Sequence, residues 1–222
     1  MFCAVIVAAG SARRAGFDKL AAPLAGVPTL CRSVQAFAQA GAGCIITVCP
    51  LSRWEALRPW EYAPGVRMLR VDGGARRQDS VCAGLAALPQ EARWVAVHDG
   101  ARPLVTPEAI RSCLQEAQAY GAAACAHPVV DTLKRADAAR STLPEHVSRE
   151  QLWGMETPQI FEVGLLKRAY ARVESEGAEV TDEVSAVELL GVATRLVPGG
   201  VNMKITLPGD LELAELLFSH RA

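Results

Sequence analysis

Short apolar runs alternate with segments of helical periodicity, and this alternation constrains the fold of the chain. Five runs have the length and composition of buried strands: residues 2–8, 44–49, 66–71, 94–98 and 122–126. Apolar residues at helical spacing lie between them: Leu30, Val34 and Phe37, then Val81, Leu85 and Leu88, then Ile110, Leu114 and Ala117. Strands that alternate with helices predict an α/β fold in which a mostly parallel, twisted sheet carries helices on both faces.

The third helix has a clear start, because Thr106 can cap it and Pro107 and Glu108 occupy its first turn. From about residue 128 to 155 the pattern gives way to a polar, charged stretch that is long for a connector. It is either an excursion with strands of its own or a mobile loop. We then expect helices at 163–174, from Thr181 onward and at 211–218, and a strand at 203–206. The 222 residues suit a single domain, 1–222.

Composition excludes several classes of partner. Lys plus Arg (23) nearly balance Asp plus Glu (24), so no global field favours nucleic acid or an anionic membrane. The seven cysteines include no Cys-x-x-Cys pair and are expected to be reduced core residues, which fits a cytoplasmic location. The apolar runs are shorter than a membrane span, and the first lacks a basic leader, so we expect a soluble, untargeted protein.

The loop after the first strand has the features of a phosphate-binding loop. Ala8, Ala9 and Gly10 are small enough for backbone amides to approach an anion, and Arg14 and Lys19 supply positive charge. The loop matches neither the P-loop nor the Gly-x-Gly-x-x-Gly dinucleotide pattern. An ordinary strand-to-helix turn with solvated cations is the alternative.

Two later loops also follow predicted strands, at the edge where such sheets bind ligands. After the third strand, Gly73 and Gly74 permit close approach of a base or ribose, whereas Asp79 and Ser80 could simply cap a helix.

After the fourth strand, Asp99 and Arg102 could together hold sugar hydroxyls, a magnesium ion or a phosphate. His98 ends an apolar run and is expected to be a core histidine rather than a catalytic one.

The motifs, taken in order, resemble the 2-C-methyl-D-erythritol 4-phosphate cytidylyltransferase family over essentially the whole chain. They are residues 8–14 with Lys19; residues 72–74 with Arg77 and residues 79–81; residues 98–103; residues 131–135; Arg149 before residues 152–153; residues 157–159; residues 181–183; and residues 202–206. The resemblance implies a Rossmann-like nucleotidyltransferase fold. It also implies transfer of a cytidylyl group from CTP to methylerythritol phosphate, with release of pyrophosphate, in the non-mevalonate route to isoprenoids.

The resemblance also assigns residue roles. The nucleotide-binding residues would be Ala8, Ala9 and Gly10 on the phosphates, with Gly74, Ser80 and Gly100 on cytidine. The residues holding the sugar phosphate would be Asp99, Arg102, Thr132 and Thr181. The catalytic cations would be Arg14 and Lys19 on the α-phosphate and pyrophosphate, and Arg149 and Lys204 on the attacking phosphate.

The implied reaction needs alignment and positive charge rather than a general base. A phosphate monoester is largely dianionic at neutral pH, so it is already a nucleophile. Mg²⁺ is the expected cofactor and would be held mainly by the CTP phosphates, with Asp99 a further candidate ligand. In this family the irregular excursion reaches a second subunit, so we expect a homodimer with arms at about 128–155, in which Thr132 and Arg149 complete the partner's site.

Simpler interpretations remain for some of these residues. Lys204 could lie on the solvent face of an edge strand, Thr181 could be a helix cap, and Arg149 could be a solvated charge. The family usually has other residues where this chain has Ala12, Ala15, Asp18 and Ala75, which affects the loops expected to hold the nucleotide. The rival functions are a ribitol 5-phosphate cytidylyltransferase, a catalytically silent nucleotide-binding module, and an oxidoreductase whose dinucleotide pattern the first loop does not match.

Overall fold

The computed structural model describes residues 1–10 and 17–220. In these residues seven strands form one sheet in the order β5-β4-β1-β6-β8-β7-β9. Their bounds are β1 Phe2–Val7, β4 Cys44–Val48, β5 Arg67–Val71, β6 Trp94–Asp99, β7 Ala122–Pro128, β8 Trp153–Glu162 and β9 Arg195–Pro198. The central strands pair in parallel, and β8 runs antiparallel to both β6 and β7. The predicted mostly parallel sheet is therefore confirmed.

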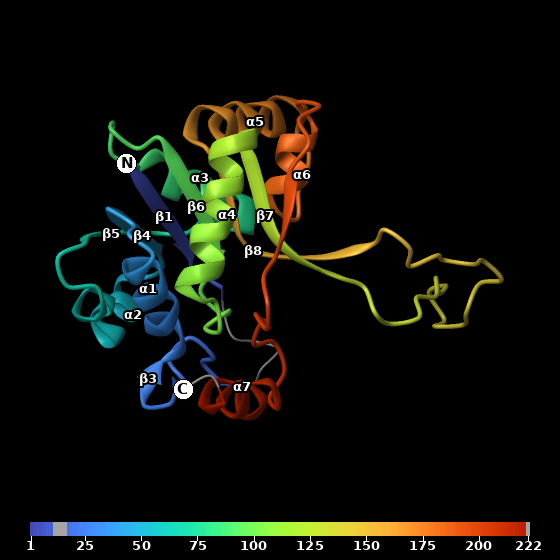
Figure 1. The fold of residues 1–222 in the computed structure, drawn as a ribbon, viewed down its shortest axis with the longest axis horizontal. Helices are drawn as coiled ribbons and strands as arrows, with labels where there is room; N and C mark the ends of the chain where they lie inside the picture. The colour runs from blue at the N-terminus through green and yellow to red at the C-terminus, as the bar shows by residue number, and fades with distance from the viewer. Residues whose placement is uncertain (11–16, 221–222) are drawn as a thin grey trace.

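Helices cover both faces of the sheet (Figure 1). Their bounds are α1 Thr29–Gln39, α2 Leu51–Leu57, α3 Arg77–Ala86, α4 Pro107–Tyr120, α5 Val163–Glu176, α6 Glu183–Glu188 and α7 Asp210–Ser219, with a 3₁₀ turn η1 at Pro59–Tyr62. Alternate residues of β1 face opposite sides, so Ile6 packs in the core with α1 and α4, and Val5 in the core with α3, α5 and α6. A smaller core joins α7 to Leu24 of the two-residue strands β2 Pro23–Leu24 and β3 Val27–Pro28.

Helix α4 forms for the local reasons that its sequence indicates. Thr106 Oγ1 accepts a hydrogen bond from Ala109 N (3.1 Å), and Pro107 starts the helix. Gly121 ends it with a positive φ of 88°, a conformation that favours glycine. The predicted cap and helix are confirmed.

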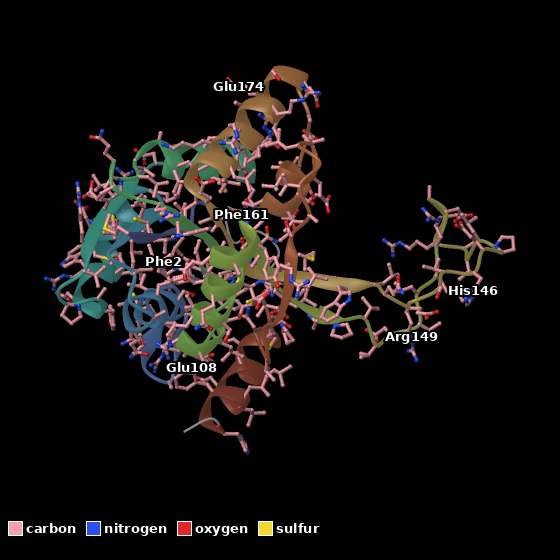
Figure 2. The ribbon with its side chains drawn as sticks, turned by 45° about the horizontal axis from the view of Figure 1, so that its top comes forward. Phe2, Glu108, His146, Arg149, Phe161 and Glu174 are labelled. Carbon is pink, nitrogen blue, oxygen red and sulfur yellow. The ribbon has the colours of Figure 1, made fainter. Side chains whose placement is uncertain are left out.

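The stretch between β7 and β8 leaves the body of the protein as a long arm (Figure 1). Beyond Pro128 and Trp153 the two sides of the arm form no continuous ladder. They are joined by separate contacts, among them a hydrogen bond from Val129 N to the carbonyl of Leu152 (3.0 Å) and an isolated bridge between Ala136 and Thr142. Figure 2 places Arg149 and His146 on this arm, well away from the helices and the sheet. The expected protruding arm exists, but it is a β-arm only near its root.

Three expectations about the elements were wrong. Residues 203–206 form no strand; they follow β9, which the sequence pattern missed. Leu88 lies beyond the end of α3. Asp182 rather than Thr181 caps α6, because its carboxylate accepts a hydrogen bond from Ser185 N (3.0 Å).

Candidate active site

Two adjoining hollows lie at the edge where β1, β5 and β6 end. The first has a volume of about 500 Å³ and is lined by residues 7–10, 19–20, 74–77, 80, 99, 101 and 204. The second has a volume of about 320 Å³ and is lined by residues 77, 99, 102, 155–157, 159, 181–182, 185 and 204. Arg77, Asp99 and Lys204 line both hollows, so they form the boundary between them.

Asp99 lies at the end of β6, where cations surround its carboxylate. Lys204 Nζ is 2.7 Å from Oδ2, Arg77 Nε is 3.2 Å from Oδ1, and Arg102 Nε is 4.0 Å from Oδ2. Burial alone would raise the pKa of Asp99, but Arg77, Lys204 and Arg102 outweigh burial and hold that pKa well below its usual range. Asp99 is therefore ionised at neutral pH.

Arg77 is fixed from behind by a buried carboxylate. Its Nη1 and Nη2 donate to Glu183 Oε1 and Oε2 at 2.7 and 3.0 Å. The Tyr170 hydroxyl donates to the same carboxylate (2.9 Å), and the Glu183 side chain is fully buried. A bidentate pair of this kind fixes the plane of the guanidinium, so the third nitrogen of Arg77 points at Asp99.

Arg53 of α2 forms a bracket across the first loop, because it contacts a residue on each side of that loop. Arg53 Nη1 donates to the carbonyl of Ala8 (2.5 Å), and Nη2 pairs with Asp18 (3.3 Å). Asp18 also accepts a hydrogen bond from Leu20 N (3.1 Å), which fixes the turn that carries Lys19 into the first hollow. Arg14 lies outside the described residues.

The second loop is closely packed around its glycines. A Cβ on Gly74 would lie 2.3 Å from the Cβ of Asp79, and a Cβ on Gly73 would lie 2.3 Å from the Cβ of Ala9. Ser80 Oγ accepts a hydrogen bond from Gly74 N (3.1 Å), and Asp79 accepts one from Arg76 N (3.0 Å) at the start of α3. Asp79 therefore helps to cap α3, but from the third position of the helix, since Arg76 is the N-cap; Ser80 connects the glycine loop to the helix.

His98 is a core residue, as predicted. Its ring is fully buried, with Nε2 3.2 Å from the carbonyl of Arg102 and Nδ1 3.1 Å from Thr157 Oγ1. Burial lowers the pKa of His98 to about 3, so the ring is neutral at physiological pH.

The remaining predicted site residues are distributed unevenly. Gly100 lines neither hollow and packs closely on its neighbours, since a Cβ there would meet the Leu30 side chain at 2.9 Å. Arg102 and Thr181 line the second hollow. Thr132 and Arg149 do not lie with them, because both line a separate hollow of about 440 Å³ on the arm.

Several site residues had not been assigned a role from the sequence. Arg77 and Glu183 belong to recognised motifs, but nothing in their spacing indicates that they pair across 106 positions. Gln159 holds the start of α6, since its Oε1 accepts hydrogen bonds from Glu183 N (3.0 Å) and Val184 N (3.1 Å). These links depend on tertiary structure and could not be found by local patterns.

The described residues offer no metal cage of their own. Among residues 1–10 and 17–220 no group of three or more His, Cys, Asp or Glu side chains is placed to hold a metal ion. Both oxygens of Asp99 already face cations, which makes this carboxylate a poor ligand for magnesium.

Among residues 1–10 and 17–220 no helix is long and apolar enough to span a membrane.

Comparison with known proteins identifies the family. The chain matches the model of the IspD family, 2-C-methyl-D-erythritol 4-phosphate cytidylyltransferase, over residues 2–220. The chain belongs to this family. It is 42% identical to the enzyme of that name from Ralstonia nicotianae, over 99% of this chain and 92% of the relative. It is 39% identical to the one from Synechococcus sp. strain CC9902, over 98% and 97% of the two chains.

Solved structures agree with this assignment. The crystal structure of 2-C-methyl-D-erythritol 4-phosphate cytidylyltransferase from Thermus thermophilus is 33% identical and superposes with a TM-score of 0.78, covering 98% of each chain. A related synthase structure from Anaerococcus prevotii, 23% identical with a TM-score of 0.85, supports the fold alone. The chain is thus a cytidylyltransferase that uses CTP and methylerythritol phosphate, and the ribitol phosphate, silent-module and oxidoreductase alternatives are not favoured.

Proposed function

We propose that the first hollow binds CTP and the second binds methylerythritol phosphate, so that the reaction takes place at their shared boundary. The observation that carries this proposal is the sharing of Arg77, Asp99 and Lys204 between the two hollows. A reaction between two anions requires both to be held in line next to fixed positive charge. Two adjoining hollows with cations between them meet that requirement.

The role proposed for each residue follows from the hollow that it lines. Ala8, Ala9 and Gly10 line the first hollow with Lys19, and they are the groups proposed to bind the triphosphate together with Arg14. Gly74 and Ser80 line its other side, where cytidine would lie. Arg102, Thr181 and Asp99 line the second hollow and would bind the polyol and its phosphate.

The charges around Asp99 indicate how methylerythritol phosphate would be bound. The phosphate of this substrate is largely dianionic at neutral pH, so it needs no base to act as a nucleophile. Lys204 contacts Asp99 and remains 41% exposed, so it can also contact a phosphate placed in the hollow. Because Arg77 and Arg102 keep Asp99 ionised, its carboxylate would accept hydrogen bonds from polyol hydroxyls rather than donate them.

Magnesium is proposed to enter with the nucleotide. Bound to the triphosphate oxygens, Mg²⁺ would offset their charge and that of the departing pyrophosphate. The protein's part would be the amides of residues 8–10 and the Lys19 ammonium, which line the hollow proposed for the triphosphate.

We also propose that the protein is a homodimer in which each arm completes the partner's second hollow. The support is that Thr132 and Arg149, which the family resemblance assigns to the sugar phosphate, lie together on the arm. Figure 2 shows that Arg149 lies on the arm, away from the body of its own chain. A cytoplasmic location is proposed from the seven cysteines, all of which are unpaired thiols.

The proposed function is tested by pyrophosphate release. With CTP and Mg²⁺, methylerythritol phosphate should support release much better than ribitol 5-phosphate. We expect Lys19→Ala to lower kcat by about 10² or more with the fold intact, the scale for losing a contact made to developing charge in the transition state. Arg111→Ala, on the exposed surface of α4, is the control and should match the wild type. A near-normal kcat in Lys19→Ala would remove Lys19 from the mechanism.

A further inference from the structure

A buried carboxylate lines the second hollow without being one of the residues proposed to touch substrate. Glu156 lies in β8 with its side chain 5% exposed. Its Oε1 is 2.8 Å from His127 Nδ1, and its Oε2 accepts a hydrogen bond from Asn202 Nδ2 (3.1 Å). Burying a carboxylate is unfavourable unless it is paired and hydrogen-bonded, so the contacts with His127 and Asn202 offset the cost of burying Glu156.

On one side Glu156 anchors the segment that carries Lys204. Residues 199–204 form no helix or strand, so their position depends on a few specific contacts. Asn202 is buried and donates to Glu156 and to the carbonyl of Thr157 (2.7 Å). At the start of the segment a Cβ on Gly199 would lie 2.4 Å from Glu156 Oε2, so the backbone there packs directly on the carboxylate.

The same anchor reaches Arg102. Arg102 Nη1 donates to the carbonyl of Asn202 (2.8 Å), and Nη2 donates to the carbonyl of Met155, next to Glu156 (3.4 Å). One acceptor of the Arg102 guanidinium therefore belongs to Met155, the sequence neighbour of Glu156. The other belongs to Asn202, whose side chain donates to the Glu156 carboxylate. A shift of Asn202 would move the Arg102 guanidinium and the Lys204 backbone together.

On the other side Glu156 is held from the root of the arm. His127 lies in β7 opposite Gly154 of β8, one residue before the paired strands give way to the arm. A Cβ on Gly154 would lie 2.7 Å from His127 Nε2, so the imidazole packs closely over the β8 backbone. The His127–Glu156 contact thus joins the strand pair from which the arm extends to the segment that carries Lys204.

We infer that Glu156 is a positioning residue for the sugar-phosphate half of the site, held in place by His127 and acting through Asn202 on Arg102 and Lys204. This inference rests on the proposed function, because it assumes that Lys204 and Arg102 bind the sugar phosphate. It assigns Glu156 no direct contact with the reacting atoms. The effect of removing it should therefore fall on one substrate and spare the other.

The test compares Glu156→Ala with Glu156→Gln. Glutamine keeps an oxygen acceptor for Asn202 and an amide that can donate to an unprotonated His127 Nδ1, whereas alanine keeps neither. We expect Glu156→Ala to raise KM for methylerythritol phosphate about tenfold and Glu156→Gln to stay within about threefold of the wild type, as expected for losing or keeping hydrogen bonds to a buried group. The Kd of CTP, titrated with Mg²⁺ and without the second substrate, should not change in either variant.

His127→Ala provides a second measurement that does not depend on replacing the buried residue. The His127 side chain is 56% exposed, so the fold should tolerate its loss. His127→Ala should also raise KM for methylerythritol phosphate. The double variant should have a KM no higher than that of Glu156→Ala alone, because His127 and Glu156 act through one contact. Glu162→Ala, an exposed glutamate at the far end of β8, is the matched control and should leave both constants unchanged.

Three results would overturn the inference: an unchanged KM for methylerythritol phosphate in Glu156→Ala and His127→Ala, an equal rise in the Kd of CTP, or additive effects in the double variant. Lys204→Met, measured in parallel, separates this failure from failure of the proposed function. If Lys204→Met leaves KM for methylerythritol phosphate unchanged, the proposed role of Lys204 is wrong. If it raises that KM while Glu156→Ala and His127→Ala do not, only the positioning role is wrong.

Discussion

The charge balance around Asp99 explains how a site for two anions can contain carboxylates. Arg77, Arg102 and Lys204 face Asp99, and Glu183 is paired with Arg77. These three cations exceed the two carboxylates by one, so the boundary between the hollows remains positive. Lys204 is 41% exposed, against 25% for Arg77 and 14% for Arg102, so it is the most exposed of these three cations and can reach a bound phosphate. The carboxylates therefore orient the cations without cancelling them.

The bracket made by Arg53 leads to a prediction about nucleotide affinity. Arg53 joins the carbonyl of Ala8 to the carboxylate of Asp18, so it fixes both ends of the loop proposed to bind the triphosphate. We expect Arg53→Ala to weaken CTP binding about tenfold, the scale of one lost charge-assisted hydrogen bond, and Asp18→Asn to weaken it less. Calorimetric titration of CTP with Mg²⁺ measures both, with Arg111→Ala as control. A Kd of CTP equal to that of the wild type in Arg53→Ala would show that the bracket does not affect the nucleotide.

At the scale of elements, the sequence predicted those strands and helices whose apolar pattern is strong. All five predicted strands exist. Four of them contain buried apolar runs, and the fifth, β5, is a half-buried edge strand that pairs in parallel with β4. Strand β8 was missed because Glu156, Thr157 and Gln159 interrupt its apolar pattern while being buried. Their polar groups are satisfied by distant residues such as Asp182 and Asn202, which no local pattern can reveal.

The opposite error occurred at residues 203–206. Met203, Lys204 and Ile205 alternate as a strand would, but Ile205 instead packs in the small core beside α7 and donates its N–H to Ala101. The strand that pairs with β7 lies earlier, at Arg195–Pro198. Of the candidate site, local patterns and the family resemblance supplied the loops at the ends of the strands. The ion pairs between loops depend on the tertiary structure and were not predicted.

The arm allows a test of subunit exchange. If Arg149 serves the partner's site, a mixed dimer of Lys19→Ala and Arg149→Ala chains contains one site with a normal body and a normal arm. Random mixing of the two inactive variants should then restore about a quarter of the wild-type activity, because half of the dimers are mixed and each has one intact site. Co-expression with two affinity tags and a pyrophosphate-release assay measures this. If each arm served its own chain, no mixture would regain activity.

The buried His98 makes the stability of the folded protein depend on pH. The ring is fully buried and packs edge-to-face against the Phe37 ring of α1, with 5.1 Å between the two ring centroids. Burial lowers the pKa of His98 from 6.5 to about 3, so the folded protein resists the proton that the unfolded chain accepts. Stability from this residue is therefore fully present above pH 6.5 and falls as the pH drops from about 6.5 toward 3.

This linkage predicts a loss of unfolding free energy in mild acid. Between pH 7 and pH 5 the wild type should lose about 2 kcal/mol, at about 1.4 kcal/mol for each pH unit below the unfolded pKa. Carboxylates add little in this window, since the pKa of Asp99 is held low and unfolded carboxyls titrate near pH 4. His98→Gln should be less stable than the wild type at pH 7, because it disturbs contacts with Arg102 and Thr157, but should lose much less between pH 7 and pH 5. Urea unfolding at the two pH values, with His146→Gln on the arm as control, measures the difference. An equal pH dependence in His98→Gln and the wild type would mean that another group is responsible for the acid sensitivity.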